Sequence, residues 1–424
     1  MNAFKIVFDV TNRLKPFLVK IIPISFLQNA KKCCLEWKTG RLKKEKIVPF
    51  KQNYYEAGIN LIGNIRGDFG LGQSCRLVAR EIQGSGIPFG ICEYHTSDKD
   101  HMEDHSCDSL LLPEPKYNMN LFHINANEFT LAYFRLGKQV WDYRYNIAFW
   151  LWELEDFPKE WAGCIDLLHE VWTPSEFVSR AIRKRTDKPV VTIPYYVETP
   201  IDARYDRSYF SLPEDQFLFL MMYDSNSIME RKNPVGVLEA FQKAFTNKSQ
   251  KAGLVIKLNG ENKEEMDFIR QYLDGCENVY FMTTVLSKTE VNSLIAVVDV
   301  YVSMHRAEGF GLVLAEAMRS GTPCIATNWS ANTEFMDKES ACLLDYELVP
   351  IQKHLGPFRK GSCWAQPNVH QAARYMQRLY EDKEFYERIS QNARRHAEKE
   401  FSLERSAELV RKRVREIYQL CCKE

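Results

Sequence analysis

The sequence has no excess of charge of either sign, because its 424 residues include 56 Lys and Arg and 56 Asp and Glu. Binding to the phosphate backbone of nucleic acid needs a basic excess, so nucleic acid is not an expected partner. Internal repeats and low-complexity segments are also missing, which excludes a solenoid and a disordered tail. With 45% hydrophobic and 26% charged residues, the composition is typical of a globular protein of two or three domains.

No C-x-x-C pair occurs among the twelve cysteines, so the sequence does not indicate a structural zinc site. A chain of this length has core enough without disulfides, and no clean export signal accompanies the cysteines, so we expect free thiols in a reducing cytoplasm. His95, His101, His105 and Cys107 cluster, but their spacing matches no standard metal module. We expect a solvated loop there, and neither a metal nor a cofactor elsewhere.

The first 51 residues differ from the rest. They hold twelve Lys or Arg and three Asp or Glu, interleaved with apolar runs such as Phe17–Val19 and Ile24–Leu27. The apolar stretch is too short to span a membrane, and Pro23 interrupts it. The mixture suits an anionic surface, which would make this leader a peripheral anchor on the inner face of the cell membrane. An ordinary basic, partly disordered leader is the alternative interpretation.

Beyond the leader, short apolar runs alternate with segments of helical period, which predicts βαβ units and parallel sheets. The first series comprises strands at 59–63, 89–92, 120–123, 147–151, 170–172 and 190–193 and a helix over 71–82. The second comprises strands at 217–221, 254–258, 279–281, 300–302 and 323–326 and helices after Pro234, over 286–297 and over 311–319. Each series predicts a doubly wound α/β domain.

Prolines at 194, 200 and 213 mark a linker between the two series, and the end of the chain is strongly helical in pattern from about Asn368. We therefore divide the chain into a leader (1–51), an N-terminal domain (52–198), a C-terminal domain (199–395) and a C-terminal helix (396–424). Ligands of such sheets bind at the carboxyl ends of the strands, so the chemistry is expected in the cleft between the domains.

The sharpest motif, His305–Gly311, follows a predicted strand and runs into a helix that carries Glu316. Gly309 and Gly311 allow a ligand to approach the backbone, and the free N–H groups of a helix start favour negative charge, which is typical of a diphosphate site. The carboxylates of Glu308 and Glu316 suit hydrogen bonds from sugar hydroxyls. An isolated pair of this kind would more simply be a capping residue and a solvated helix position.

The pair does not stand alone. Glu308 and Glu316, with Gly-Phe-Gly between them, resemble the E-x7-E motif of retaining glycosyltransferases of family 4 (glycosyltransferase group 1). Other segments resemble a bacterial subgroup of this family with W-E-L, R-K-N-P and H-R-x-E-G-F-G sequences, in the right order: Gly67–Gly72 with Arg76, Trp150–Leu154, Val171–Phe177, Asp224–Ser227, Arg231–Pro234 and Ser330–Met336. The resemblance implies the GT-B fold, with two Rossmann-like domains facing each other.

The resemblance also implies roles in the C-terminal domain. Glu316 would hold the donor ribose and Glu308 would contact the donor sugar, with backbone contacts from Gly309, Phe310 and Gly311. Lys232 would offset the charge of the departing diphosphate. The family commonly has an arginine about six residues before this lysine, where the present sequence has Asn226, so Arg231 or Arg306 would share the task. Glu308 is expected in an open part of the cleft.

In the N-terminal domain, Gly67, Gly70 and Gly72 do not follow the G-x-G-x-x-G order of dinucleotide sites, which argues against a nicotinamide enzyme. Gly70 and Gly72 would close over the donor phosphates, or form a tight turn only. His123 resembles the histidine that the family places near the reacting sugar, although its neighbours could simply satisfy it.

A group of aromatic residues allows two interpretations, stacking on a sugar face or packing in the core: Trp150, Trp152, Phe157 and Trp161.

The function that the resemblance implies is transfer of a sugar from a nucleotide-sugar donor to a hydroxyl of a glycan or lipid-linked acceptor. Configuration would be retained without a metal, in cell-surface polysaccharide biosynthesis. A nucleotide-sugar epimerase, a phosphorylase or another GT-B enzyme is one alternative, and a catalytically silent scaffold at the membrane is another. The complete set of Glu308, Lys232 and Glu316 argues against a scaffold.

Overall fold

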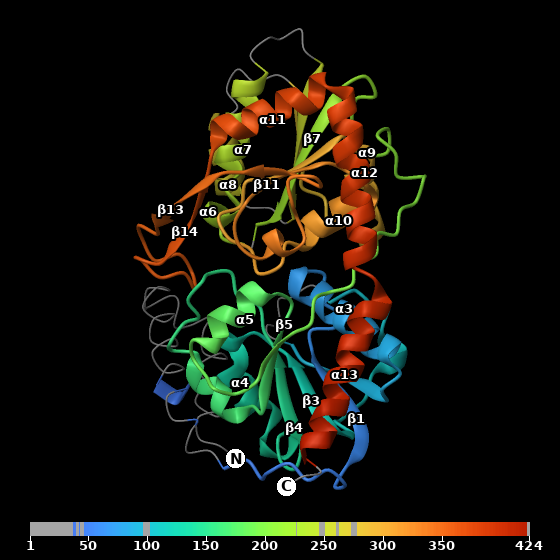
Figure 1. Ribbon diagram of the computed structural model, residues 1–424, viewed down its shortest axis with the longest axis vertical. Coiled ribbons are helices and arrows are strands. Elements are labelled where there is room, and N and C mark those ends of the chain that lie inside the picture. Colours follow the sequence, from blue (N-terminus) through green and yellow to red (C-terminus); the bar gives the residue numbers. More distant parts are fainter. Residues whose placement is uncertain are drawn as a thin grey trace.

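The computed structural model describes residues 37–39, 42, 46–95, 102–225, 227–245, 251–259, 263–272 and 278–421. They form two α/β lobes, the N-terminal one at the bottom of Figure 1 and the C-terminal one at the top. Most of the leader and Asn226 lie outside the described residues, so the membrane-anchor interpretation of 1–51 stays a prediction. Within the described part, no helix is both long and apolar enough to cross a membrane.

The N-terminal lobe is built on a six-stranded parallel sheet in the order β2-β1-β3-β4-β5-β6. Its strands are β1 (Glu56–Gly63), β2 (Phe89–Glu93), β3 (Tyr117–His123), β4 (Tyr145–Phe149), β5 (Glu170–Thr173) and β6 (Val190–Thr192). The helices are α3 (Gly70–Ser85), α4 (Ala126–Leu136) and α5 (Glu176–Arg183), with short 3-10 turns at Asp108–Leu110, Lys138–Val140 and Ala162–Leu167. α3 lies on the opposite side of the sheet from α4 and α5 (Figure 1).

The C-terminal lobe has a second six-stranded parallel sheet, in the order β12-β11-β10-β7-β8-β9. Its strands are β7 (Phe217–Asp224), β8 (Ala252–Asn259), β9 (Val279–Met282), β10 (Val300–Ser303), β11 (Cys324–Thr327) and β12 (Cys342–Leu344). The helices are α6 (Met229–Lys232), α7 (Pro234–Ala244), α8 (Lys263–Tyr272), α9 (Lys288–Val297) and α10 (Leu312–Ser320), with a 3-10 turn at Ala331–Glu334. Two doubly wound layers in tandem confirm the predicted fold class.

An antiparallel hairpin of β13 (Tyr346–Pro350) and β14 (Cys363–Pro367) follows the second sheet. The loop of this hairpin reaches the N-terminal lobe, where the buried ring of Phe358 packs at 5.7 Å from Trp152. Both rings belong to a core cluster that also contains Trp150 and Phe157. The aromatic residues of this region are therefore core residues, and the interpretation as a sugar-stacking face is wrong for Trp150, Trp152 and Phe157.

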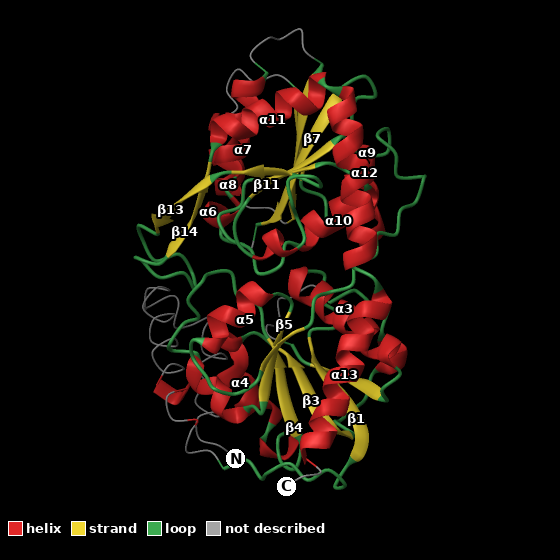
Figure 2. Cartoon of the chain, viewed as in Figure 1, coloured by secondary structure: helices red, strands yellow, loops and turns green. Residues whose placement is uncertain are grey.

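Three helices end the described chain: α11 (Val369–Glu381), α12 (Lys383–Glu400) and α13 (Leu403–Cys421). The strong helical pattern from Asn368 onward predicted them, but it did not predict where they lie. α12 packs on α10 in the C-terminal lobe, whereas α13 crosses back and packs on α3 of the N-terminal lobe (Figures 1 and 2). The helical end is thus shared between the lobes.

The two lobes are joined by a continuous core. Phe310 of the C-terminal lobe lies 4.9 Å from Tyr195 and 5.3 Å from Phe335, and Phe335 lies 5.1 Å from Phe401. Eight cysteines are described and all are free thiols, so the covalent chain and this packing hold the described lobes together.

Candidate active site

The loop between β10 and α10 holds the strongest candidate residues, because the carboxyl end of β10 and the start of α10 meet there. Gly311 has φ +91°, a left-handed conformation that favours glycine, and it forms the N-cap of α10. His305, at the start of the loop, is fully buried and hydrogen-bonds Ser303 at 3.0 Å and Asn332 at 3.0 Å. The loop therefore leaves the sheet with a fixed direction.

The segment Arg231–Asn233 is hydrogen-bonded to this loop and fixes its position. The Arg231 guanidinium donates to the carbonyl of Ala307 at 2.9 Å, and the Arg231 carbonyl accepts the N–H of Arg306 at 2.8 Å. Asn233, with φ +54°, accepts the Gly236 N–H and so caps α7, while its Nδ2 donates to the Met304 carbonyl at 3.0 Å. The R-K-N-P sequence is thus a structural partner of the H-R-x-E loop.

Glu308 is the centre of a group of charges. Its Oε1 contacts the Lys232 ammonium and lies 3.1 Å from Arg231 Nη1. Burial would raise the pKa of the Glu308 carboxyl, but the charges of Lys232 and Arg231 outweigh burial and lower the pKa to about 2. Burial likewise opposes the charged form of Arg231, yet Glu308 and Glu153 raise its pKa. Glu308 and Arg231 are therefore charged at neutral pH, whereas burial lowers the pKa of Lys232 against the opposing effect of Glu308.

Glu316 is the fifth residue of α10 and is only 2% exposed. Its Oε1 is paired with the ammonium of Lys288, the first residue of α9. The structure thus places both glutamates at one end of the C-terminal sheet, each with a cation. The assigned roles toward ribose and sugar remain predictions.

The N-terminal lobe faces the loop directly. A Cβ atom at Gly309 would lie 2.9 Å from the carbonyl oxygen of Trp152, so the absence of a side chain there permits close approach of the lobes. Ser175 donates to the Gly309 carbonyl at 2.8 Å. The Glu334 carboxylate accepts the N–H groups of Glu176 and Phe177 at 2.9 and 2.7 Å and so caps α5 from the other lobe.

These contacts correct one expectation. We expected Glu308 in an open part of the cleft, but its side chain is only 13% exposed and is paired with two cations. The physical reason is the close approach of Trp152 and Ser175 to Gly309, which brings the lobes together over the loop. The turn does lie opposite the N-terminal lobe, as the GT-B resemblance implies.

His123 ends β3 at the carboxyl edge of the N-terminal sheet, but it is fully buried. Its Nε2 hydrogen-bonds Ser74 Oγ at 2.7 Å, and Ser74 in turn contacts the Tyr195 hydroxyl. Burial lowers the pKa of His123 to about 4, so the ring is neutral at pH 7. Its Nδ1 has no hydrogen-bond partner among the described residues. Contact with a sugar stays a prediction, and it would require the buried Nδ1 to become exposed.

The glycine-rich loop after β1 has two different glycines. A Cβ at Gly72 would lie 2.1 Å from the Gly67 carbonyl oxygen, so Gly72 is required by the tight turn itself. A Cβ at Gly70 would meet nothing within 4 Å, and Gly70 is exposed. Of the two, Gly70 has the geometry that leaves room for a ligand.

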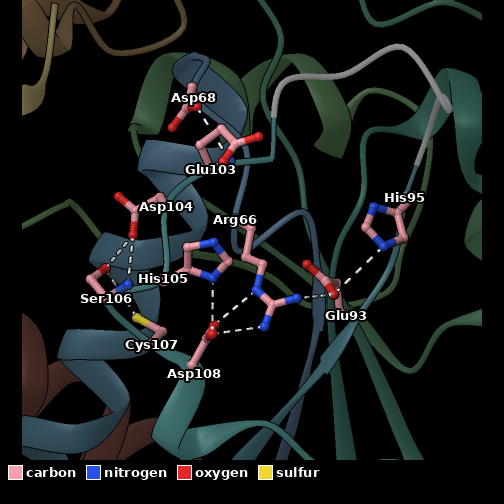
Figure 3. A network of polar contacts seen from close by, with 10 residues as sticks. All are labelled: Arg66, Asp68, Glu93, His95, Glu103, Asp104, His105, Ser106, Cys107 and Asp108. Carbon is pink, nitrogen blue, oxygen red and sulfur yellow. Dashed lines mark hydrogen bonds and ion pairs between the residues drawn. The ribbon is translucent and has the colours of Figure 1, made fainter.

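A polar network braces this loop (Figure 3). Arg66 binds Asp108 with two hydrogen bonds of 2.8 Å and reaches Glu93 at 3.3 Å, and His105 Nδ1 lies 2.9 Å from Asp108. His95 lies 3.6 Å from Glu93. His101 is outside the described residues, and no group of His, Cys, Asp and Glu in the described part could hold a metal ion.

The Arg306 side chain is bound to residues of the β13–β14 hairpin and to Glu230. Its Nε and Nη2 donate to Gln366 at 3.0 and 2.7 Å, its Nη1 donates to the Glu230 carbonyl at 3.0 Å, and it stacks on Trp364 at 5.2 Å. Its partners fix the hairpin to the H-R-x-E loop, and its role toward a phosphate stays a prediction.

Three residues of this region were not assigned any role from the sequence: Glu153, Lys288 and Glu334. Glu153 belongs to the quoted W-E-L sequence, but only the fold brings its charge near Arg231. Lys288 did carry a signal, since it follows Ser287 in an S-x-x-E capping box, where a cation opposes the helix dipole.

Comparisons with known proteins agree with this architecture. Residues 206–396, most of the C-terminal lobe, match the family model described as glycosyl transferases group 1. No curated protein sequence matches the chain. Many solved structures match it.

HepE of Anabaena, in complex with UDP and glucose, is 12% identical with a TM-score of 0.62, and the alignment covers 85% of this chain and 100% of that one. Sucrose-phosphate synthase of Thermosynechococcus elongatus is 14% identical with a TM-score of 0.61, covering 86% and 100%. A glycosyltransferase of Rickettsia africae is 12% identical with a TM-score of 0.62, covering 86% and 99%. At such identities the likeness shows the fold, and the GT-B arrangement of two facing Rossmann-like domains is confirmed.

Proposed function

We propose that this protein is a glycosyltransferase that moves a sugar from a nucleotide-sugar donor to a hydroxyl of a glycan or lipid-linked acceptor, with retention of configuration. The observation that carries the proposal is the charge group of Arg231, Lys232 and Glu308 at the start of α10, facing the N-terminal lobe. The match of residues 206–396 to glycosyl transferases group 1 supports it.

The chemistry follows from how the charges are arranged. Lys232 and Arg231 are fixed next to the helix start, so they stabilise the negative charge that develops on a departing diphosphate without having to reorganise. Glu308, kept ionised by these cations, accepts hydrogen bonds from sugar hydroxyls and holds the sugar beside the leaving group. His123, neutral at pH 7, would offer Nδ1 to a hydroxyl of the sugar or the acceptor only in a state in which this buried atom is exposed.

The donor is best sought among UDP-sugars. HepE has been solved with UDP and glucose and with UDP-glucose. The acceptor class rests on the basic leader, since an anchor at an anionic membrane surface would bring the enzyme to lipid-linked or growing cell-surface polysaccharide. We place the protein on the cytoplasmic side of that membrane.

The experiment is a donor screen on the full chain. UDP-, GDP-, dTDP- and CMP-sugars are tested for thermal stabilisation, because a ligand that binds only the folded state raises Tm. The stabilising donor is then supplied with candidate acceptors, and NMR of the product establishes the anomeric configuration. Activity is expected to survive EDTA, because charge neutralisation is assigned to Lys232 and Arg231.

The first variant to test is Glu308→Gln, which keeps the shape of the side chain and removes its charge. We expect kcat to fall about 100-fold to 1000-fold, the loss seen when one charge-stabilising group is removed. Glu339→Gln is the matched control, because Glu339 is an exposed glutamate of the same lobe. Near-wild-type turnover of Glu308→Gln would contradict the site, and release of an altered sugar with free nucleotide but no acceptor would indicate an epimerase.

A further inference from the structure

The pairing between Lys288 and Glu316 has no counterpart in the roles assigned so far. Lys288 is the first residue of α9, and its ammonium contacts Glu316 Oε1 on α10, 28 residues away in sequence. Glu316 is 2% exposed while Lys288 is 29% exposed. One end of the pair is thus buried and the other is partly exposed.

A lysine at the position of Lys288 does not stabilise the start of its own helix, α9. The N-terminus of a helix carries partial positive charge and prefers carboxylates, so a lysine at the first position opposes the dipole. The local capping needs are already met, because Ser287 accepts the Glu290 N–H at 3.3 Å and Glu290 accepts the Ser287 N–H at 2.8 Å. Glu290 also accepts from Tyr209 at 2.6 Å. Lys288 is therefore not needed to cap α9, and its specific interaction is the ion pair with Glu316.

The same face of α9 carries another polar group. Asn292 lies one turn after Lys288 and is fully buried, and neither atom of its side-chain amide has a hydrogen-bond partner among the described residues. Buried amides are normally paired by protein, water or ligand, so a polar face of this kind differs from a plain packing surface. Asn292 thus adds a buried polar group to the face of α9 that carries Lys288.

We infer that Lys288 is a positioning residue for the donor nucleotide, which holds the Glu316 carboxylate in the orientation that receives the ribose hydroxyls. This inference rests on the proposed function. A carboxylate with one oxygen fixed by a cation presents its remaining lone pairs in a defined direction, and it cannot rotate away when the nucleotide leaves. The expected consequence is selective recognition of a nucleotide that carries ribose hydroxyls.

The test compares Lys288→Met with Lys288→Arg, and with Lys338→Met as the control at an exposed lysine of the same lobe. The probes are UDP and 2′,3′-dideoxy-UDP, measured by calorimetry on the full chain, with GDP, dTDP and CDP tested if UDP does not bind. We expect Lys288→Met to weaken UDP binding about tenfold and to leave dideoxy-UDP binding unchanged. Lys288→Arg should stay within about threefold of wild type, because it keeps the charge.

A second readout tests whether Lys288 acts through Glu316. If it does, the double variant Lys288→Met with Glu316→Gln binds UDP no more weakly than Glu316→Gln alone. In turnover, the donor KM of Lys288→Met should rise about tenfold while kcat changes less than threefold.

Equal losses for UDP and dideoxy-UDP, additive effects in the double variant, or a lower Tm with unchanged affinity would each overturn the inference. If the wild-type chain binds none of the nucleoside diphosphates, the proposed function fails and the inference fails with it. Binding by wild type with unchanged affinity in Lys288→Met removes the inference alone.

Discussion

At the carboxyl edges of the two sheets, the ends of the central strands β10 and β3 differ in chemistry. In the C-terminal lobe this edge carries ion pairs, with Glu308 held by Arg231 and Lys232, and Glu316 held by Lys288. In the N-terminal lobe the last residue of β3, His123, is neutral and hydrogen-bonded to Ser74, and the ion pairs of Arg66 with Glu93 and Asp108 lie beside β1 and β2. Both lobes have the same doubly wound architecture, so the fold does not dictate this difference.

The difference indicates that charged groups have different roles in the two lobes. A diphosphate leaving group needs compensating charge, and the cations that we assign to it, Arg231 and Lys232, both lie on the C-terminal lobe, where short helices and loops fix them. The N-terminal lobe instead has its buried charge pair at the opposite end of its sheet, where Glu170 begins β5 and meets Arg413 of α13 at 2.5 Å. Charge in the C-terminal lobe serves the proposed chemistry, and charge at Glu170 serves the docking of α13.

The largest effect on activity is expected at Lys232. Replacing it with Met removes a cation that we assign to the leaving group and should lower kcat about 100-fold to 1000-fold, equivalent to about 3–4 kcal/mol in the barrier. Ser74→Ala, which removes the hydrogen-bond partner of the neutral His123, should cost less than about tenfold in the same steady-state assay. A larger loss of kcat in Ser74→Ala than in Lys232→Met would contradict the greater importance that we give to the charged groups of the C-terminal lobe.

The largest effect on stability is expected at Arg413. Arg413→Leu leaves the Glu170 carboxylate buried and without its cation, which should cost about 3–5 kcal/mol in the free energy of unfolding. Urea unfolding followed by circular dichroism measures it. Arg415→Leu, at an exposed site of the same helix, should have little effect, and adding Glu170→Gln to Arg413→Leu should recover part of the loss.

A pH-dependent effect follows from His123. Its pKa is lowered to about 4 in the fold, from an ordinary value near 6.5, because burial disfavours the charged ring. The neutral His123 ring contributes fully to the free energy of unfolding above pH 6.5. This contribution is lost as the pH falls toward 4, by about 3 kcal/mol in all.

The difference in unfolding free energy between wild type and His123→Asn should therefore shrink between pH 7 and pH 4, as measured by urea unfolding at each pH. Part of the acid sensitivity should persist in the variant, because burial also lowers the pKa of His169 to about 4. A difference that stays constant with pH would show that His123 is not held neutral by the fold.

The smallest effect is expected where an ion pair is exposed. Lys251 and Asp215 are 2.7 Å apart, and both side chains are about two-thirds exposed, at 67% and 68%. Lys251→Ala should leave Tm and turnover within experimental error, because solvent screens such pairs. A clear loss of activity would mean that charge far from α10 also matters, which would weaken the contrast between the lobes.

Much of the fold could be predicted from the sequence because its signals are local. The strands Phe217–Asp224 and Ala252–Asn259 are continuous apolar runs, and the helix Gly70–Ser85 has a helical period. The placement of Glu308 and Glu316 around a helix start followed from glycines and spacing alone. The position of α13 could not be predicted, because an amphipathic helix does not specify which of two similar sheets it covers.

The sequence by itself determined two doubly wound layers and a strand–loop–helix junction with two carboxylates, since period and turn chemistry act over a few residues. Only the tertiary structure decided which charges meet. Lys288 meets Glu316 across 28 positions of sequence, and Arg413 meets Glu170 across 243. The Trp152 carbonyl lies against Gly309, more than a hundred positions away. Such contacts depend on how whole lobes pack, which no local pattern encodes.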